Sequence, residues 1–380
     1  MSFELPQRYQ QLREQALALA DSVAERAAEA DDSMTADPVM RKALAESGLT
    51  ALAVPRAHGG TDEKVDSLAM TVVREALMGT SAHLDGLFGM QGIGSLALSV
   101  AGSEELKQTW LPRVARLDAI AALALTEPDV GSDLRSVTTT ISAGADSSVA
   151  VSGHKSFITN AGDAAFYTVL GREDDGYSLV LVPADAPGVL VERGPKLIAP
   201  HILGEVRFDD VRLPANHRVG APGEAFKLVL ATLATFRVSV AGAAVGLAQA
   251  ALDEAVRHTT GRRQFGSALA ELGPIPQLLG TSWLEIEQAR LLTYQAASRA
   301  AADPLGNLHL SSMAKVAATE AAGRVTDRAV QMMGRFGLIT GSKIERLYRN
   351  ARPMRIYEGG NEVLLGQLGR KLTKHRVSAG

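Results

Sequence analysis

The spacing of hydrophobic residues changes twice along the chain. From about residue 6 to residue 117, apolar residues recur at three- and four-residue intervals, and Gly48 and the pair Gly59-Gly60 interrupt the pattern. This spacing is typical of amphipathic helices. We therefore expect the N-terminal part of the chain to be entirely helical.

Between residues 121 and 214 the helical spacing gives way to short runs rich in β-branched residues. Such runs occupy residues 148–151, 167–170, 178–182 and 189–192. Turn residues separate them, among them Asp175-Gly176 and the segment 186–188, Ala-Pro-Gly. Short β-branched runs separated by turns indicate antiparallel strands, so a small β domain is expected here.

From residue 223 onward the helical spacing returns in three long segments, 226–258, 281–302 and 308–333. Helices of this length with few breakers pack together as a bundle. The order helix, strand, helix predicts a segregated α+β fold rather than an alternating βαβ sheet. The expected domains are an all-α domain at residues 1–120, a β domain at 121–221 and a helical bundle at 222–380.

Composition excludes several functional classes. Lys and Arg number 39 against 42 Asp and Glu, so no polyanion-binding surface is indicated and nucleic acid is not an expected partner. The absence of cysteine removes disulfides, thiol nucleophiles and thiolate metal sites. The eight histidines are scattered and no metal-binding motif is present, so no metal is expected. The charged N-terminus and the lack of an uninterrupted apolar run of about 18 residues predict a cytoplasmic protein without membrane insertion.

A loose dinucleotide-binding pattern, GxGxxA, occurs at residues 92–97. That motif requires a preceding β-strand, because its glycines form the tight turn between strand and helix. Here the preceding segment, HLDGLFGMQ, belongs to the helical pattern. Close packing of a helix is therefore the favoured interpretation of Gly92 and Gly94.

The segment TEPDVGSD, residues 126–133, follows an apolar run that reads as a buried strand. The hydroxyl of Thr126 and the amides around Gly131 and Ser132 could face a phosphate group. Alternatively, this could be an ordinary loop in which Ser132 or Asp133 caps a short helix. Further on, Phe157 and Thr159 are two residues apart and would share one side of a strand, where an aromatic ring and a hydroxyl suit a flavin.

A second unusual segment, IYEGGNE at residues 356–362, places one carboxylate among apolar residues and a diglycine. Poor solvation would raise the pKa of Glu358 and make it a stronger base. The alternative is a carboxylate near a helix start capped by Asn361.

Several motifs occur in a fixed order, and with them the whole sequence resembles the acyl-CoA dehydrogenase superfamily of flavoproteins. Besides the two segments above and Lys155–Asn160, they are Val54-Pro55-x-x-x-Gly59-Gly60, Gly102-Ser-Glu-Glu-x-Lys107-x-x-Trp110-Leu-Pro112, Phe208-Asp-Asp-Val211-x-Leu-Pro214, Arg262-x-x-Phe265-Gly266 and Tyr357-Glu358-Gly359. The resemblance implies a β-barrel-like central domain, a C-terminal four-helix bundle and bound FAD.

By position, the resemblance also assigns site residues. Those expected to contact FAD within one subunit are Leu125, Thr126, Gly131, Ser132, Phe157, Thr159 and Gly360. Those expected to reach the FAD of a neighbouring subunit are Arg262, Gln264, Phe265, Leu269, Gln331 and Gly334. The implied assembly is a homo-oligomer, a tetramer or a dimer.

Glu358 matches the catalytic base of the common branch of this family. In other branches the base occupies the position of Phe236, which cannot accept a proton. The resemblance therefore implies α-proton abstraction by Glu358 and β-hydride transfer to flavin N5, giving a trans-2-enoyl thioester. Arg237, Tyr357 and Gly359 would lie at the substrate, and an electron-transfer flavoprotein would accept the electrons.

The chain also departs from the family pattern. Gly360 replaces the usual threonine, Arg335-Phe336 interrupts a glycine-rich turn, Gly273-Pro274 replaces a region that normally carries a glutamine, and the segment Lys196–Gly204 is shortened and apolar. These changes leave open a substrate whose acyl group is attached to an acyl or peptidyl carrier protein instead of CoA. A separate alternative is a catalytically silent relative that serves as an interaction scaffold, against which the retention of Glu358 speaks. A basic run between Lys343 and Arg355 could dock an acidic partner or simply be a solvated face.

Overall fold

The computed structural model describes residues 4–144, 148–174 and 176–377, so Asp175 of the predicted turn lies outside the described residues. Contacts divide the chain into two compact units. We call the first the helical unit, which comprises Met1–Asp31, Ser67–Asp85 and Arg237–Gly380. The second, the sheet unit, comprises Asp32–Asp66 and Gly86–Phe236. The domain boundaries after residues 120 and 221 stay a prediction.

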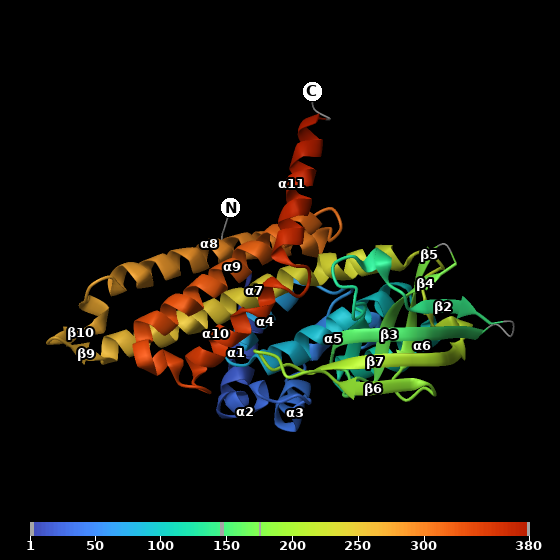
Figure 1. Ribbon diagram of the computed structural model, residues 1–380, viewed down its shortest axis with the longest axis horizontal. Coiled ribbons are helices and arrows are strands. Elements are labelled where there is room, and N and C mark those ends of the chain that lie inside the picture. Colours follow the sequence, from blue (N-terminus) through green and yellow to red (C-terminus); the bar gives the residue numbers. More distant parts are fainter. Residues whose placement is uncertain (1–3, 145–147, 175, 378–380) are drawn as a thin grey trace. The chain divides into compact units, whose positions relative to one another are not determined.

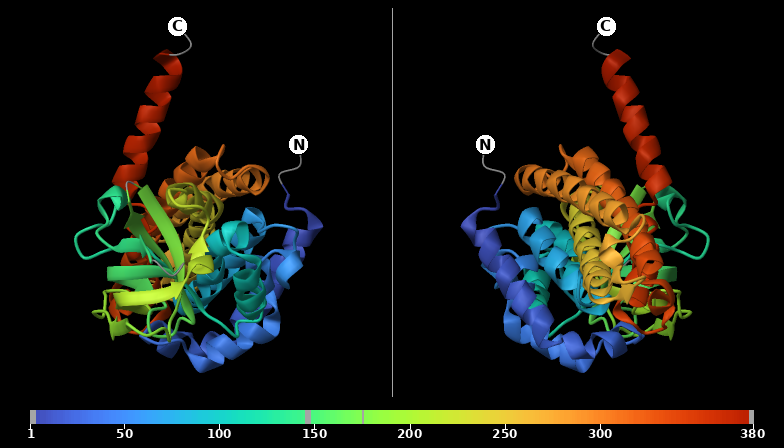
Figure 2. Two further views of the ribbon diagram at one scale, coloured as in Figure 1. Left: turned by 90° about the vertical axis from the view of Figure 1, so that its right-hand side faces the viewer. Right: turned by 90° about the vertical axis from the view of Figure 1, so that its left-hand side faces the viewer.

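The helical unit is built around three long helices that lie side by side (Figure 1). They are α7 (Ala225–Gly261, from Arg237 onward), α8 (Ile275–Ala302) and α9 (Leu308–Met333), which confirms the three predicted helical segments. The further helices of this unit are α1 (Gln7–Ser22), α2 (Ala27–Asp31), α4 (Ser67–Met78), α10 (Lys343–Ala351) and α11 (Asn361–Val377). The last of these extends away from the other helices of the unit (Figure 2).

Small apolar side chains form the core of the helical unit. Alanines and valines of α7 pack with alanines of α8 and α9 in one buried cluster. Small side chains let helix backbones approach closely, which aligns the long helices and fixes the positions of the polar residues that interrupt their apolar faces.

The sheet unit contains an eight-stranded sheet in the described part of the chain. Its strands are β1 (Ala121–Ala124), β2 (Thr140–Ala143), β3 (Ser148–Thr159), β4 (Phe166–Glu173), β5 (Gly176–Pro183), β6 (Val189–Arg193), β7 (Leu203–Pro214) and β8 (Arg218–Val219). The order is β6-β7-β3-β2-β4-β5-β8, and β1 pairs with β4. The helices of this unit are α3 (Pro38–Ser47), α5 (Ala82–Ala101, from Gly86 onward) and α6 (Glu104–Ala115).

Most strand pairs are antiparallel, as predicted, but β1 and β2 each pair with β4 in parallel. Alternating valines and isoleucines of β2 to β7 point into a single buried cluster. The predicted strand runs lie inside β3, β4, β5 and β6, which confirms the mixed α+β class. The parallel pairing of β1 places the end of this strand, and the loop that follows it, beside β3.

Gly92 and Gly94 lie within α5. A Cβ added at Gly92 would be 2.3 Å from Cζ of Phe236, and one added at Gly94 would be 2.7 Å from Cβ of Ala121. Both glycines therefore allow close helix packing, as expected, and residues 4–91 contain no strand before them.

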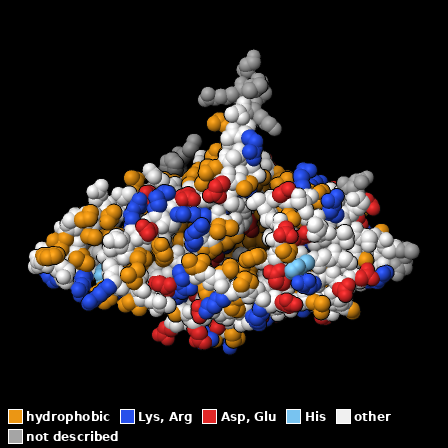
Figure 3. Space-filling view, viewed as in Figure 1, with side chains coloured by type: hydrophobic (Ala, Val, Ile, Leu, Met, Phe, Trp, Pro, Cys, Tyr) orange, Lys and Arg blue, Asp and Glu red, His pale blue; other side chains and the backbone are white. Residues whose placement is uncertain are grey.

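Two helices, α5 and α7, are long and apolar enough to cross a membrane by length and composition alone. Within their most apolar windows, however, 72% and 83% of the residues are buried in the folded chain, as in core helices of globular proteins. On the face shown in Figure 3, basic and acidic side chains are interspersed.

Candidate functional site

The loop after β1 is held in place from its buried side. The amide of Ser156 in β3 donates to the carbonyl of Thr126 at 3.0 Å. The carboxylate of Glu127, which is 3% exposed, accepts hydrogen bonds from the amides of Thr138 at 2.7 Å and Thr139 at 2.9 Å. Lys155, fully buried in β3, donates to the same carboxylate and to the carbonyl of Leu125, both at 2.9 Å.

These contacts determine the protonation states of Glu127 and Lys155. Burial acts to raise the pKa of Glu127, but hydrogen bonds from Thr139 and Thr138 outweigh it and lower the value to about 2. Burial also lowers the pKa of Lys155 to about 8, against the attraction of Glu127. Both groups are therefore charged at neutral pH, and the ion pair fixes the loop that begins at Leu125.

The exposed side of this loop offers hydrogen-bond donors. In the described part of the chain, the amides of Gly131 and Ser132 and the hydroxyl of Thr126 have no protein partner. The short 3-10 helix that follows, Leu134–Ser136, begins after Asp133 and has no side-chain cap, so the interpretation in which Ser132 or Asp133 caps it is not supported. Free amides of this kind suit the phosphates of a nucleotide.

An aromatic ring lies at the adjoining end of β3. Phe157 is 53% exposed, Ile158 is buried and Thr159 is half-buried, so both predicted residues are accessible. Phe157 adopts φ = 54° at an irregularity of β3 and not the extended conformation from which a shared side was predicted. The hydroxyl oxygen of Ser156 is buried and has no hydrogen-bond partner among the residues that the structure describes. The sheet unit thus joins the predicted residues Leu125, Thr126, Phe157 and Thr159, and the free donors and aromatic ring fit FAD.

The helical unit carries its own group of candidate residues, in the loop between the 3-10 helix Pro353–Arg355 and α11. Glu358 has φ = 55° and Gly359 has φ = 100°, two consecutive left-handed residues. For a residue other than glycine this conformation is uncommon and costs about 1–3 kcal/mol. The carbonyl of Glu358 accepts a hydrogen bond from Nε of Arg237 in α7 at 2.9 Å, which holds the strained backbone.

The carboxylate of Glu358 is poorly solvated. Its Oε2 atom is buried and has no hydrogen-bond partner among the described residues. Burial raises the pKa of Glu358, while the positive charges of Arg237, Arg74 and Lys315 act in the opposite direction. An unsatisfied carboxylate with a raised pKa suits a proton acceptor.

The cations near Glu358 are themselves held in place. Buried Arg74 forms a two-pronged ion pair with Asp85, at 2.8 and 2.6 Å. Arg237 also donates to Oγ of Ser312 at 3.1 Å. The alternative in which Asn361 caps a helix beside Glu358 is not supported, because its side chain binds residues of α9 instead.

Among the residues predicted to bind substrate, Arg237 and Gly359 lie beside Glu358, and Tyr357 precedes it with 37% of its surface exposed. Gly360 follows in the same loop. Phe236 is fully buried, with its ring against Gly92.

The residues predicted to reach a neighbouring subunit gather at the far end of α7. A two-residue turn, Phe265 at φ = 49° and Gly266 at φ = 84°, joins β9 (Arg263–Gln264) to β10 (Ser267–Ala268). Phe265 is 97% exposed at the tip, and Leu269 follows, half-buried.

The guanidinium of Arg262 lies 5.4 Å from the ring centre of Phe336, which also contacts Arg335 at 5.1 Å. This contact joins the hairpin to the turn after α9, where Gln331 and Gly334 are exposed. At about 1.5 Å per residue, α7 separates Arg262 from Arg237 by about 38 Å. Within one helical unit, the hairpin set and the Glu358 loop are therefore two distinct sets.

Sequence reasoning missed the buried charges around both loops: Arg74, Asp85, Lys155 and Lys315. The burial of Lys315 could have been inferred from the sequence, because this residue lies on the same apolar face of the predicted helix 308–333 as Ala318 and Ala322. A lysine on a core-facing stripe requires a partner, although the sequence alone does not show which one.

The basic run after residue 342 is not a free cationic surface. Arg346 pairs with Asp31 at 2.9 Å, and Arg349 with Glu345 at 2.5 Å, within the helical unit. Lys343 and Arg355 each have a carboxylate within 4 Å as well. The solvated or internal interpretation is therefore favoured over docking.

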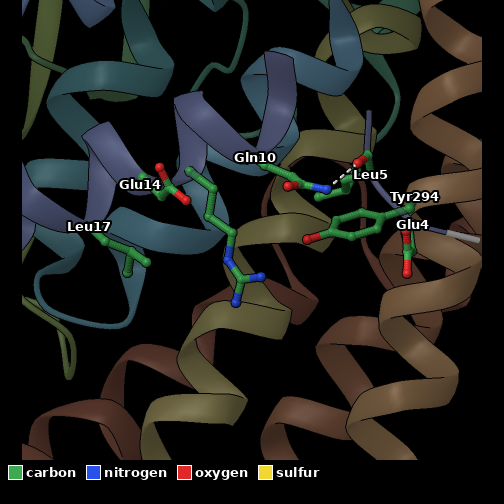
Figure 4. Close-up of a pocket in the computed structure, with 7 residues that line it drawn as sticks. Glu4, Leu5, Gln10, Glu14, Leu17 and Tyr294 are labelled. Atoms are coloured by element: carbon green, nitrogen blue, oxygen red, sulfur yellow. Dashed lines mark hydrogen bonds between the residues drawn. The ribbon is translucent and has the colours of Figure 1, made fainter. Parts of the chain in front are cut away.

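A pocket of about 510 Å³ lies in the helical unit between α1 and Tyr294 of α8 (Figure 4). It is lined by Glu4, Leu5, Gln10, Arg13, Glu14, Leu17 and Tyr294. None of the predicted site residues lines it. Among the described residues, no group of three or more His, Asp or Glu could hold a metal ion.

Comparison with known proteins gives matches along the whole chain. Three family models match: the acyl-CoA dehydrogenase N-terminal domain at residues 6–118, the middle domain at 122–211 and the C-terminal domain at 223–373. A probable acyl-CoA dehydrogenase of Mycobacterium tuberculosis is 34% identical over 98% of this chain and 97% of its own.

Solved structures agree. Butyryl-CoA dehydrogenase from Megasphaera elsdenii has a TM-score of 0.92 and 28% identity, covering 98% of this chain and 100% of its own. Glutaryl-CoA dehydrogenase from Mycobacterium smegmatis in complex with FADH2 has a TM-score of 0.91 and 25% identity, covering 97% of this chain and 95% of its own.

Proposed function

This chain belongs to the acyl-CoA dehydrogenase family of FAD-dependent oxidoreductases, and we propose that Glu358 is the base that removes the α-proton of a saturated acyl thioester. FAD, when bound, would supply the acceptor for the hydride that leaves the β-carbon. The product is a trans-2-enoyl thioester. Every hydrogen is then accounted for: the α-hydrogen leaves as a proton to the carboxylate, and the β-hydrogen leaves with its electron pair.

The observation that carries the proposal is the unpartnered Oε2 atom of Glu358, buried and held in a left-handed loop. A carboxylate without hydrogen bonds gains the most by taking a proton, since its charged form is poorly stabilised. The backbone amide of Glu358 also has no acceptor among the described residues, so it can donate to the thioester carbonyl. That donation would stabilise the negative charge that develops on the carbonyl oxygen.

Substitution of the base gives the direct test. A Glu358→Gln enzyme keeps the shape of the side chain but cannot accept a proton. We expect retained FAD and a rate of flavin bleaching by substrate that is about 10²–10⁴-fold lower. Asp327→Asn, which neutralises an exposed carboxylate of α9, is the matched control and should bleach at nearly the wild-type rate. Fast bleaching in Glu358→Gln would refute the assignment.

The substrate class is tested by the visible spectrum, recorded anaerobically before and after adding a series of saturated acyl-CoAs. We expect the oxidised-flavin band to be lost with one or more of them. A bound flavin that is bleached only by a saturated acyl group attached to a carrier protein would establish the carrier-bound substrate instead. Protein that cannot be reconstituted with FAD would support the silent scaffold.

The proposal includes two partners. A second copy of the chain would supply the Arg262 and Phe265 hairpin, because that hairpin is about 38 Å along α7 from Arg237. An electron-transfer flavoprotein is proposed as electron acceptor from the family resemblance.

A further inference from the structure

Lys315 is a buried cation that the proposed mechanism does not yet use. It lies in α9, is 0% exposed, and its Nζ donates to the carbonyl of Gly359 at 2.8 Å and to Oδ1 of Asn361 at 2.9 Å. Burying an ammonium group is costly unless hydrogen bonds and charges compensate it. Here the compensation comes from the loop that carries Glu358.

The bond from Lys315 belongs to a network that reaches the loop from two helices. On one side, Asn361 donates to Oγ1 of Thr319 at 3.0 Å and to Glu320 at 2.8 Å, both in α9. On the other side, Arg237 of α7 holds the carbonyl of Glu358 at 2.9 Å. Two consecutive left-handed residues thus have both carbonyls bound by cations of two different helices.

We propose that Lys315 is a positioning residue for the base: it holds the Gly359 carbonyl and Asn361, which keeps Glu358 in its strained conformation, and it places a positive charge beside the carboxylate. The inference rests on the proposed role of Glu358. Lys315 itself need not touch substrate, since it acts through the backbone on either side of the base.

The charges around Lys315 determine the sign of its effect. Arg237 faces it as a like charge, and Glu358, Glu362 and Glu320 face it as opposite charges. Burial, together with Arg237, lowers the pKa of Lys315 to about 8, so the ammonium form still predominates at pH 7. A positive charge near Glu358 lowers the pKa of that carboxylate, so removing the charge raises it further.

The test is Lys315→Met, which keeps the length and apolar stem of the side chain and removes its charge and its donors. We expect the maximal rate of flavin bleaching by substrate to fall about tenfold or more, with little change in substrate affinity. The acid limb of the rate against pH should move to higher pH by about one unit. A purely structural lysine would lower thermal stability without moving this limb.

Val325→Ala is the matched control, because Val325 is buried in the same helix and lies in its core. It should lower stability and leave the acid limb in place. Lys315→Arg keeps the charge, so it should restore the acid limb to its wild-type position, while its different donor geometry leaves the rate reduced.

If Lys315→Met does not fold, Asn361→Ala removes one of the two acceptors of Lys315 and keeps the charge. It should lower the rate and leave the acid limb unchanged; an unchanged rate would contradict the positioning role. Wild-type rate and acid limb in Lys315→Met, with bleaching lost in Glu358→Gln, would overturn this inference alone. Bleaching retained in Glu358→Gln would overturn the proposed function itself.

Discussion

At the scale of single residues, backbone strain coincides with three of the predicted contacts. Phe157, Phe265 and Glu358 adopt φ values of 54°, 49° and 55°. Positive φ also occurs away from the site, at Leu117, Asn160, Asp174 and Asp210. Asn and Asp tolerate it more easily, and the carbonyl of Leu117 is held by Arg41 at 3.1 Å. A bulky aromatic or a glutamate persists there only where other contacts hold the backbone, as Arg237 and Lys315 do beside Glu358.

The raised pKa of Glu358 predicts the acid limb of activity. The base must be ionised to accept a proton, so activity is present above its pKa and is lost as pH falls through it. Because burial raises this pKa, the limb should lie above the ordinary glutamate value of 4.5. The measurement is the maximal bleaching rate as a function of pH; a limb at or below the ordinary value would contradict the prediction.

The two glycines after Glu358 should respond differently to threonine. A Cβ at Gly360 would meet only Oε2 of Glu362, at 3.7 Å, so Gly360→Thr should fold normally and add the hydroxyl that the family usually has there. We expect FAD to be retained more tightly, by about 1 kcal/mol for one new hydrogen bond.

Gly359→Thr is the comparison for that substitution. Gly359 has φ = 100°, and its Cβ would lie 3.1 Å from Leu364, so strain should destabilise the protein by about 1–3 kcal/mol. The measurements are the FAD dissociation constant and the melting temperature of both variants. Equal FAD affinity and equal melting temperature in the two variants would contradict the predicted difference between the two glycines.

At the scale of elements, each of the two site loops is tied to its unit by a fully buried lysine. Lys155 of β3 binds the carbonyl of Leu125, and Lys315 of α9 binds the carbonyl of Gly359. Burial lowers the pKa of each to about 8. A rigid strand or helix therefore places each loop, which suits a site whose geometry must be kept while its exposed donors stay unpaired.

Glu127→Gln tests whether the ion pair between Glu127 and Lys155 stabilises the loop after β1. Removing the charge leaves buried Lys155 without its counter-ion, so we expect a loss of stability of about 3 kcal/mol at neutral pH and weaker FAD retention. The folded-state pKa of Glu127 is lowered to about 2, so its contribution is present above the ordinary value of 4.5 and is lost as pH falls toward 2. Denaturant unfolding should show the wild type and the variant converging near that lower limit; a constant difference would count against this account.

The hairpin β9–β10 presents Phe265 at the cost of backbone strain. Asparagine favours left-handed turn positions, so Phe265→Asn should leave the stability of the fold unchanged or raise it by up to about 1 kcal/mol. FAD retention should nevertheless fall, because the exposed ring is lost. Melting temperature and bound flavin are measured together; a parallel loss of both would show that the ring supports the fold instead.

At the scale of the whole molecule, the proposed function predicts that a complete site draws on two copies, because α7 separates Arg237 from Arg262 by about 38 Å. Coexpression of Glu358→Gln with Arg262→Ala tests this. Each variant alone should be inactive or short of FAD, whereas mixed assemblies contain sites with both native residues. Random pairing in dimers would restore about a quarter of the sites. No recovery above the separate variants would refute a shared site.

Much of the fold could be predicted from the sequence, because a long segment whose apolar residues keep a single helical or strand spacing indicates its own secondary structure. The helices at 226–258 and 308–333 and the strand at 178–182 were recognisable for this reason. The parallel pairing of β1 with β4 could not be predicted, because the residue pattern within a strand does not show which strand lies next to it.

Short motifs single out Glu358 and Phe157 as candidate site residues, and their roles stay predictions; the buried cations near Glu358 could not be predicted from the sequence. Lys315 and Asn361 are 46 positions apart, and only the packing of α9 against the loop brings them together. Arg74 likewise gains its role from Asp85, a residue with no distinguishing sequence context.

The ring of Phe236 fills the space that the missing side chain of Gly92 leaves open. A descendant of this protein could not transfer the base to position 236 in one step. A glutamate at position 236 would lose the packing of the ring against Gly92 and bury a second carboxylate while Glu358 still occupied its loop. That single change should destabilise the fold by about 3 kcal/mol, because a buried aromatic ring is lost and a charge is buried in its place. Moving the base therefore requires changes at both position 236 and position 358.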